Sequence, residues 1–212
     1  TQANLNKGTF DQIVENFYHQ VYGLIEGGAD VLLIETQQDI LETKAIIEGA
    51  NKAFAEKKTK LPMIVQATVD VFSKMQIFNT DIHAAYTAVS EMGIDVFGIN
   101  CNVGPDEMVA TVEKLSRFCR HPISVVPNAG QPISEDGQTR YKLSPEDMVN
   151  TMEPFVREHG VVIVGGCCGT TPAHIKALRK KLDGITPATR QPDEKIYVSG
   201  PQEAVPIDGS KG

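Results

Sequence analysis

Amphipathic segments alternate with short apolar runs along most of the chain. Residues that recur with helical spacing predict helices, and apolar runs bounded by polar residues predict strands buried on both faces. The predicted helices cover residues 9–27, 39–57, 80–92, 105–118, 144–159 and 171–182. The predicted strands, some of which run into loops, cover residues 29–36, 61–70, 94–104, 121–130 and 160–169.

Several helix boundaries carry local signals. Thr9 and Ser144 are suited to cap the helices that follow them, and Pro105 stands at a first helical position. A polar stretch that ends at Tyr141 predicts a loop. From Asp183 onward the periodicity disappears among Pro, Gly, Gln and Asp, so residues 183–212 are interpreted as a tail or interdomain linker.

Five strand-then-helix units at regular spacing favour an α/β fold, a parallel sheet with helices outside it. A TIM (β/α)₈ barrel has eight strands and about 250 residues. Because the sequence shows five strand signals, it predicts either an open α/β sheet or the last five units of such a barrel, in residues 1–182.

Composition narrows the class of partner. The 212 residues suffice for one sizeable domain, and a formal net charge of −7 argues against a nucleic-acid partner. No apolar stretch approaches the roughly 20 residues of a membrane span, and no secretory signal stands at the N-terminus. Four cysteines do not suggest a disulfide scaffold, so we expect a cytoplasmic protein whose thiols serve a metal or catalysis. A start at Thr1 indicates an excised or processed piece.

The candidate functional residues lie at or just after the predicted strands' carboxyl ends, where parallel α/β folds build their sites. They are Glu35, Cys101, Asn128, Cys167 and Cys168. If the strands are parallel, three of the thiols meet at one rim. Zinc prefers tetrahedral thiolate sites, and three protein ligands with one open position is the catalytic pattern. Cys119 falls at the opposite rim and is not expected to be a ligand.

The adjacent cysteines in VVIVGGCCGTTPAHI, residues 161–175, need a special backbone. Neighbours on a regular strand point to opposite faces, so both can reach one metal only where the strand ends. Gly165, Gly166 and Gly169 would permit such a turn. Two alternatives stay open: small buried apolar side chains, and a redox pair.

These segments resemble the homocysteine methyltransferase domain family. The resemblance rests on GGCCGTTPAHI, GINCNVGP and ADVLLIETQQDILETKA, and runs in order from about residue 9 to 182. It implies a zinc site at Cys101, Cys167 and Cys168, with Asn128 able to approach the zinc when homocysteine is absent. It also implies substrate binding by Glu35, at the homocysteine amino group, and by Asn100. Without the resemblance, Glu35 would be interpreted as an ordinary strand-end charge.

The resemblance extends to activity and partners. It implies that zinc activates the homocysteine thiol for methyl transfer from methylcobalamin to give methionine, as in the cobalamin-dependent branch of the family. Cobalamin-binding and folate-binding modules of the same protein would be partners, and residues 183–212 resemble the connector to the folate-binding barrel. The alternatives are a betaine- or S-methylmethionine-dependent methyltransferase and a non-catalytic zinc-binding fragment. The family's first barrel strands are not present, so part of the substrate site is expected to be missing or supplied by another segment.

Overall fold

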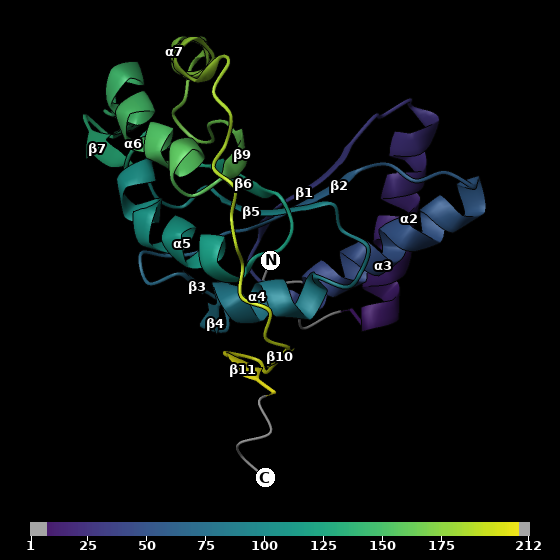
Figure 1. Ribbon diagram of the computed structural model, residues 1–212. Helices are drawn as coiled ribbons and strands as arrows, with labels where there is room; N and C mark the ends of the chain where they lie inside the picture. The colour runs from purple at the N-terminus through teal and green to yellow at the C-terminus, as the bar shows by residue number, and fades with distance from the viewer. Residues whose placement is uncertain (1–7, 208–212) are drawn as a thin grey trace.

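The computed structural model describes residues 8–207 (Figure 1). Its central sheet has five strands, β1 (Leu32–Gln37), β2 (Met63–Ala67), β5 (Val96–Asn100), β6 (Ile123–Val126) and β9 (Val161–Val164). The helices are α2 (Phe10–Glu26), α3 (Ile40–Lys57), α4 (Ile82–Val89), α5 (Pro105–Phe118), α6 (Pro145–Arg157) and α7 (Pro172–Leu182). None of the helices in this part of the chain has the length and apolar character to cross a membrane.

The five strands are all parallel, and their order in the sheet, β1-β2-β5-β6-β9, is their order along the chain. Because parallel crossovers are right-handed, a sheet wound in one direction carries its helices on one face. Figure 1 shows this arrangement, with α2 and α3 at one end of an arc, α4 in the middle, and α5 and α6 at the other end. The prediction of a parallel α/β fold is therefore confirmed.

The predicted helix caps explain where the helices begin. Thr9 forms a capping box with Gln12, and the Ser144 hydroxyl accepts a hydrogen bond from the Asp147 N–H at 3.1 Å. Pro105 opens α5 as expected. The helix predicted from Thr80 begins at Ile82 instead, because Thr80 pairs with Met75 in a short hairpin.

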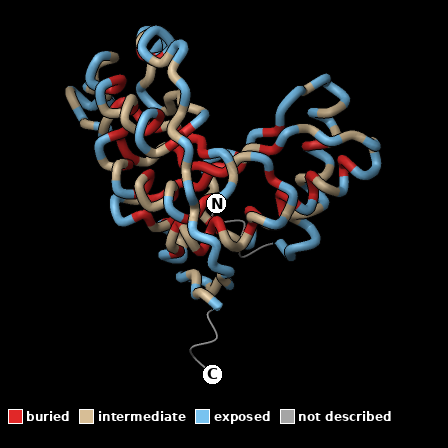
Figure 2. The backbone as a smooth tube through the Cα atoms, in the orientation of Figure 1, coloured by how far each residue is buried: buried red, intermediate tan, exposed pale blue. Residues whose placement is uncertain are grey.

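The core lies between the sheet and its helices. Strand residues that point toward the helices are buried, among them Met63, Val65, Phe97 and Ile123. On the other face, Leu33 retains 47% and Val162 49% of its accessible surface. Figure 2 shows the buried backbone gathered along the sheet and the inner sides of the helices. One face of the sheet is therefore left partly uncovered by residues 8–207.

On that second face, three neighbouring strands approach one another closely. Gln66, Gly98 and Ser124 lie side by side in register on β2, β5 and β6. The Gln66 amide reaches across Gly98 and donates to the Ser124 hydroxyl at 2.7 Å. A Cβ at position 98 would lie 2.0 Å from the Ser124 carbonyl oxygen, so only glycine fits there.

Three short antiparallel hairpins were not predicted from the sequence. They are β3 (Lys74–Met75) with β4 (Thr80–Asp81), β7 (Ile133–Glu135) with β8 (Gln138–Arg140), and β10 (Tyr197–Ser199) with β11 (Ala204–Pro206). The second corrects the predicted polar loop before Tyr141. Its turn, Asp136-Gly137, has φ values of 51° and 73°, which suit a two-residue hairpin turn. The Asp-Gly pair was the signal for this hairpin.

Residues 183–212 were interpreted as a tail or interdomain linker, and their described part, which ends at residue 207, lies against the body of the fold. This segment donates hydrogen bonds to carbonyls in the last turns of two helices, from Ala188 N–H to Val156 and from Asp193 N–H to Arg117. Such carbonyls lack partners within their own helix, so an extended chain can dock there without any periodicity of its own. The Arg190 guanidinium adds a 2.6 Å hydrogen bond to the His121 carbonyl.

Candidate metal centre

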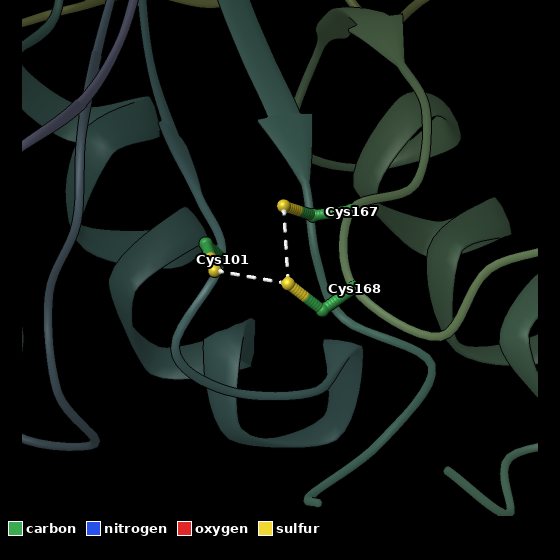
Figure 3. A group of neighbouring side chains, drawn as sticks. All are labelled: Cys101, Cys167 and Cys168. Atoms are coloured by element: carbon green, nitrogen blue, oxygen red, sulfur yellow. Dashed lines mark hydrogen bonds between the residues drawn. The ribbon is translucent and has the colours of Figure 1, made fainter. Parts of the chain in front are cut away.

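Four of the predicted site residues come together at the carboxyl ends of three neighbouring strands. Cys101 directly follows β5, Asn128 follows β6 by two residues, and Cys167 and Cys168 follow β9. Figure 3 shows the three sulfur atoms pointing toward one another from two loops. The expectation that the thiols share one rim is confirmed.

The spacing of the thiols suits one tetrahedral metal ion. The Cys168 sulfur lies 3.7 Å from the Cys101 sulfur and 3.9 Å from the Cys167 sulfur. All three sulfur atoms lie within 4.8 Å of one another. Zinc–sulfur bonds of about 2.3 Å in tetrahedral geometry separate the sulfurs by about 3.8 Å. The geometry and the soft donor set therefore both fit zinc.

A left-handed turn redirects the chain at Cys101. Cys101 and Asn102 have φ values of 61° and 64°, a region that non-glycine residues rarely occupy. The turn is held by hydrogen bonds from the Cys101 N–H to the Val126 carbonyl at 3.0 Å and from the Asn102 amide to the Val69 carbonyl at 2.9 Å. Backbone strain of this kind tends to mark functional sites.

The glycines around Cys167 and Cys168 have different roles. Gly169 has a φ of 77°, which glycine adopts without strain. At Gly166 a Cβ would lie 2.3 Å from the Thr170 side chain, so the close approach requires glycine. Gly165 was expected to contribute in the same way, but its φ is not positive and a Cβ there would make only ordinary contacts. The strand ends before the two cysteines, as predicted.

Asn128 is tied to the thiol loop through its side chain. It is 3% exposed, and its Oδ1 accepts a hydrogen bond from the Cys168 N–H at 3.1 Å. Its own N–H donates to the Val103 carbonyl at 3.0 Å. In this conformation Asn128 positions the Cys168 backbone, and its role as a metal ligand stays a prediction.

Asn100, at the end of β5, is fully buried and supports β1, two strands away in the sheet. Its Oδ1 accepts from the Thr36 N–H at 3.0 Å, and its Nδ2 donates to the Thr36 hydroxyl at 2.8 Å. Thr68 donates to the Asn100 carbonyl at 3.0 Å. Thr36 has a φ of 61°, unusual for a β-branched residue. Sequence reasoning missed Thr36 and Thr68, because only the fold brings them to Asn100.

Glu35 lies within β1, near the carboxyl end of the strand that was predicted over residues 29–36. It alternates with the buried Leu32 and Ile34, so its exposed side chain shares the uncovered face with Leu33. The structure therefore places Glu35 and the thiols at the same end of the sheet, on different strands. Substrate binding by Glu35 stays a prediction.

The cysteines differ in their electrostatic surroundings. Burial raises the pKa of Cys167 to about 12, and the neighbouring Cys101 and Cys168 thiols add to this effect. Burial also raises the pKa of Cys119 to about 12, although the Arg190 charge opposes the shift. Cys119 is 0% exposed and lies outside the cluster, as predicted. Three thiolates side by side are therefore unfavourable unless a cation is bound between them.

Solved structures with this arrangement of elements include the homocysteine methyltransferase MmuM from Escherichia coli. Its metallated form covers 79% of this chain with a TM-score of 0.60 and 23% identity, and this chain covers 52% of it. The apo form gives a TM-score of 0.60 and 24% identity, with 79% and 57% covered. This likeness shows a shared fold.

Two curated relatives are longer proteins. Methionine synthase from Mycobacterium tuberculosis (strain ATCC 25618 / H37Rv) is 39% identical over 185 residues, and that from Mycobacterium leprae (strain TN) is 38% identical over 181 residues. The alignments cover 87% and 83% of this chain, which spans about 15% of each relative. The family model for homocysteine S-methyltransferase matches residues 2–182, a range that contains all three clustered thiols. The chain therefore belongs to the homocysteine S-methyltransferase family.

Proposed function

We propose that this chain holds zinc on Cys101, Cys167 and Cys168 and uses the site to activate the thiol of homocysteine for methylation. The observation that carries the proposal is the convergence of three sulfur atoms, from loops far apart in sequence, at tetrahedral spacing. Zinc held in this way would lower the pKa of a further thiol placed at its open position. Membership of the family supports homocysteine as that thiol.

The surrounding residues supply orientation. Asn128 fixes the backbone of Cys168, and Asn100 fixes Thr36, the residue after Glu35. We assign the exposed Glu35 carboxylate to the ammonium group of homocysteine, because a carboxylate is a poorer zinc ligand than a thiolate but a good partner for a cation. Asn100 acts through Thr36, since its own amide is buried and engaged.

We further propose that the chain is the C-terminal part of a (β/α)₈ barrel. The singly wound parallel sheet supports this, because its helices lie outside and β1 pairs on one side only within residues 8–207. The exposed Leu33 and Val162 would then face the barrel interior. The remaining strands would come from another segment of the protein, which would also complete the substrate pocket.

The methyl donor in this proposal is methylcobalamin, carried by another module of the same protein. The support is the identity to two methionine synthases over most of this chain. Residues 183–212 would connect the barrel to a following module, which we propose to bind folate. Methyl transfer assayed with and without methylcobalamin separates this donor from betaine and S-methylmethionine.

The zinc site is tested by metal analysis of the purified chain. We expect one zinc per chain in the wild type and none in the Cys101→Ser, Cys168→Ser double variant, because one thiolate cannot hold the ion alone. The matched control is Cys119→Ser, which keeps a donor for the His121 carbonyl and lies outside the cluster. Stoichiometric zinc in the double variant would contradict the proposed site.

A further inference from the structure

The hairpin of β10 and β11 is fastened to a loop that starts at the rim of the metal site. This loop, residues 68–81, follows β2 and contains β3 and β4, and we call it the rim loop. The Thr80 hydroxyl donates to the Pro201 carbonyl at 2.6 Å, and the Asp81 N–H donates to the Gln202 carbonyl at 2.8 Å. Both acceptors lie in the turn between β10 and β11, and Figure 1 shows this hairpin close to β4 and α4. The hairpin therefore holds the end of the rim loop that leads into α4.

The rim loop is bonded across its own base. The Asp70 N–H donates to the Lys74 carbonyl at 2.9 Å, and the Ile82 N–H donates to the Ser73 carbonyl at 2.9 Å. The Asp70 carboxylate also accepts from the Lys74 N–H at 3.0 Å. The buried Ser73 hydroxyl forms a 2.7 Å hydrogen bond with the Thr111 hydroxyl of α5. A shift at the α4 end of the rim loop is therefore passed to its β2 end.

The β2 end of the rim loop holds the backbone on both sides of Cys101. The Thr68 hydroxyl donates to the Asn100 carbonyl at 3.0 Å, just before Cys101. The Asn102 amide donates to the Val69 carbonyl at 2.9 Å, just after it. Cys101 and Asn102 both have positive φ values, and such a turn persists only where its surroundings hold it. The rim loop supplies two of the contacts that do so.

The hairpin itself buries little apolar surface. Val198 and Val205 retain 52% and 53% of their accessible surface. A hollow of about 960 Å³ lies between the hairpin and the start of α3. One further hydrogen bond runs from the Ser199 hydroxyl to the Ala84 carbonyl of α4 at 2.9 Å. Segments attached in this way open locally at a small cost in free energy.

We propose that the β10–β11 hairpin is a positioning element for Cys101 and acts on it through the rim loop. When the hairpin opens, the rim loop loses its hold at the α4 end, and the turn at Cys101 relaxes from its positive φ values. The inference rests on the proposed function only in so far as Cys101 holds a metal. A metal bound at Cys101 would in turn make opening of the hairpin less favourable, because coupling between two sites acts equally in both directions.

Hydrogen exchange of the chelator-treated 212-residue chain, followed amide by amide by NMR, tests the coupling. The Val103 N–H reports the turn, because it donates to the Cys101 carbonyl at 2.8 Å. In Thr80→Val, which keeps the side chain's shape but loses its bond to the hairpin, exchange at Val103 should be about fivefold faster. The loss of one hydrogen bond shifts an opening equilibrium by about that factor. Ser199→Ala, on the hairpin itself, should act in the same direction. The matched control is Thr139→Val, at an exposed position on β8, which should leave the rate at Val103 unchanged.

An unchanged rate at Val103 in Thr80→Val would overturn the inference, because the hairpin would then hold the rim loop without affecting the turn at Cys101. Zinc chloride added to the wild type tests the reverse direction. It should slow exchange at Asp81 about fivefold and leave the rate at Lys58, at the C-terminal end of α3, unchanged. Zinc that binds without slowing exchange at Asp81 would also overturn the inference. A wild type that binds no zinc would instead overturn the proposed function, and the metal-free measurement would still decide the role of the hairpin.

Discussion

Asn100 is itself fully buried, and it stabilises the strained Thr36 on β1 with two hydrogen bonds made from the end of β5. We predict that Asn100→Ala lowers the free energy of unfolding by about 2 kcal/mol, because both hydrogen bonds to Thr36 are lost and a fully buried side chain is truncated. Urea denaturation measures this. Gln138→Ala, at an exposed position on β8, is the control and should change stability little. Equal stabilities for the two variants would show that Thr36 does not depend on Asn100.

At the scale of single residues, the sequence predicted the thiols but not their supports. Cys101, Cys167 and Cys168 were found from their residue type and their place after apolar runs. Thr36 and Asn100 are 64 positions apart, so their contact depends on the pairing of β1, β2 and β5. Tyr141 ended a polar stretch and gave no sign that its ring would pack on Gly169.

At the scale of elements, alanine substitution at two glycines should change the free energy of unfolding in opposite directions. Gly98→Ala should lower the free energy of unfolding by about 3 kcal/mol, because the new methyl group would overlap the Ser124 carbonyl on β6. Gly23→Ala in α2 should raise it by about 0.5–1 kcal/mol, since nothing lies within 4 Å of the added Cβ and alanine favours the helix. Urea titration of both variants checks the pair. A tolerated Gly98→Ala would mean that β5 and β6 are less closely apposed.

Long amphipathic elements were predictable because their burial pattern repeats over many residues. The end of α5 at Phe118 and the caps Thr9 and Ser144 agree with their local signals. The hairpins β3–β4 and β10–β11 were missed because each of their strands has only two or three residues, too few to show a period. Their positions depend on contacts with the body of the fold.

At the scale of the whole molecule, the segment after α7 is part of the folded body. Arg190 holds it to the carbonyls of Cys119 and His121, and the Thr80 hydroxyl donates to the Pro201 carbonyl at 2.6 Å. We predict that Arg190→Ala speeds chymotrypsin cleavage at Tyr197 in the native protein, because the segment opens more often. Arg140→Ala, which loses only a surface contact to Gln138, is the control. Cleavage as slow as in the wild type would mean that other contacts suffice to hold the segment.

The sequence could not predict this docking, since the contacts are made by backbone groups and by one arginine. Carbonyls at helix ends accept hydrogen bonds from any extended chain, whatever its residues. Gly160 has a φ of 64°, and a side chain there would meet the Ala188 carbonyl oxygen at 2.4 Å, so the docked segment requires glycine at this position. Which segment occupies such a space depends on the whole fold.

The separation of the two thiol loops along the chain has a consequence for the unfolded state. Cys101 and Cys168 are 67 positions apart, and the segment between them contains α5, β6, α6 and β9. One ion shared by both loops would act as a removable cross-link over this segment. Closing a ring of that length lowers the conformational entropy of the unfolded chain by an amount worth about 4 kcal/mol at 25 °C. A metal ion proposed for its role in thiol activation would thus also constrain nearly a third of the polypeptide.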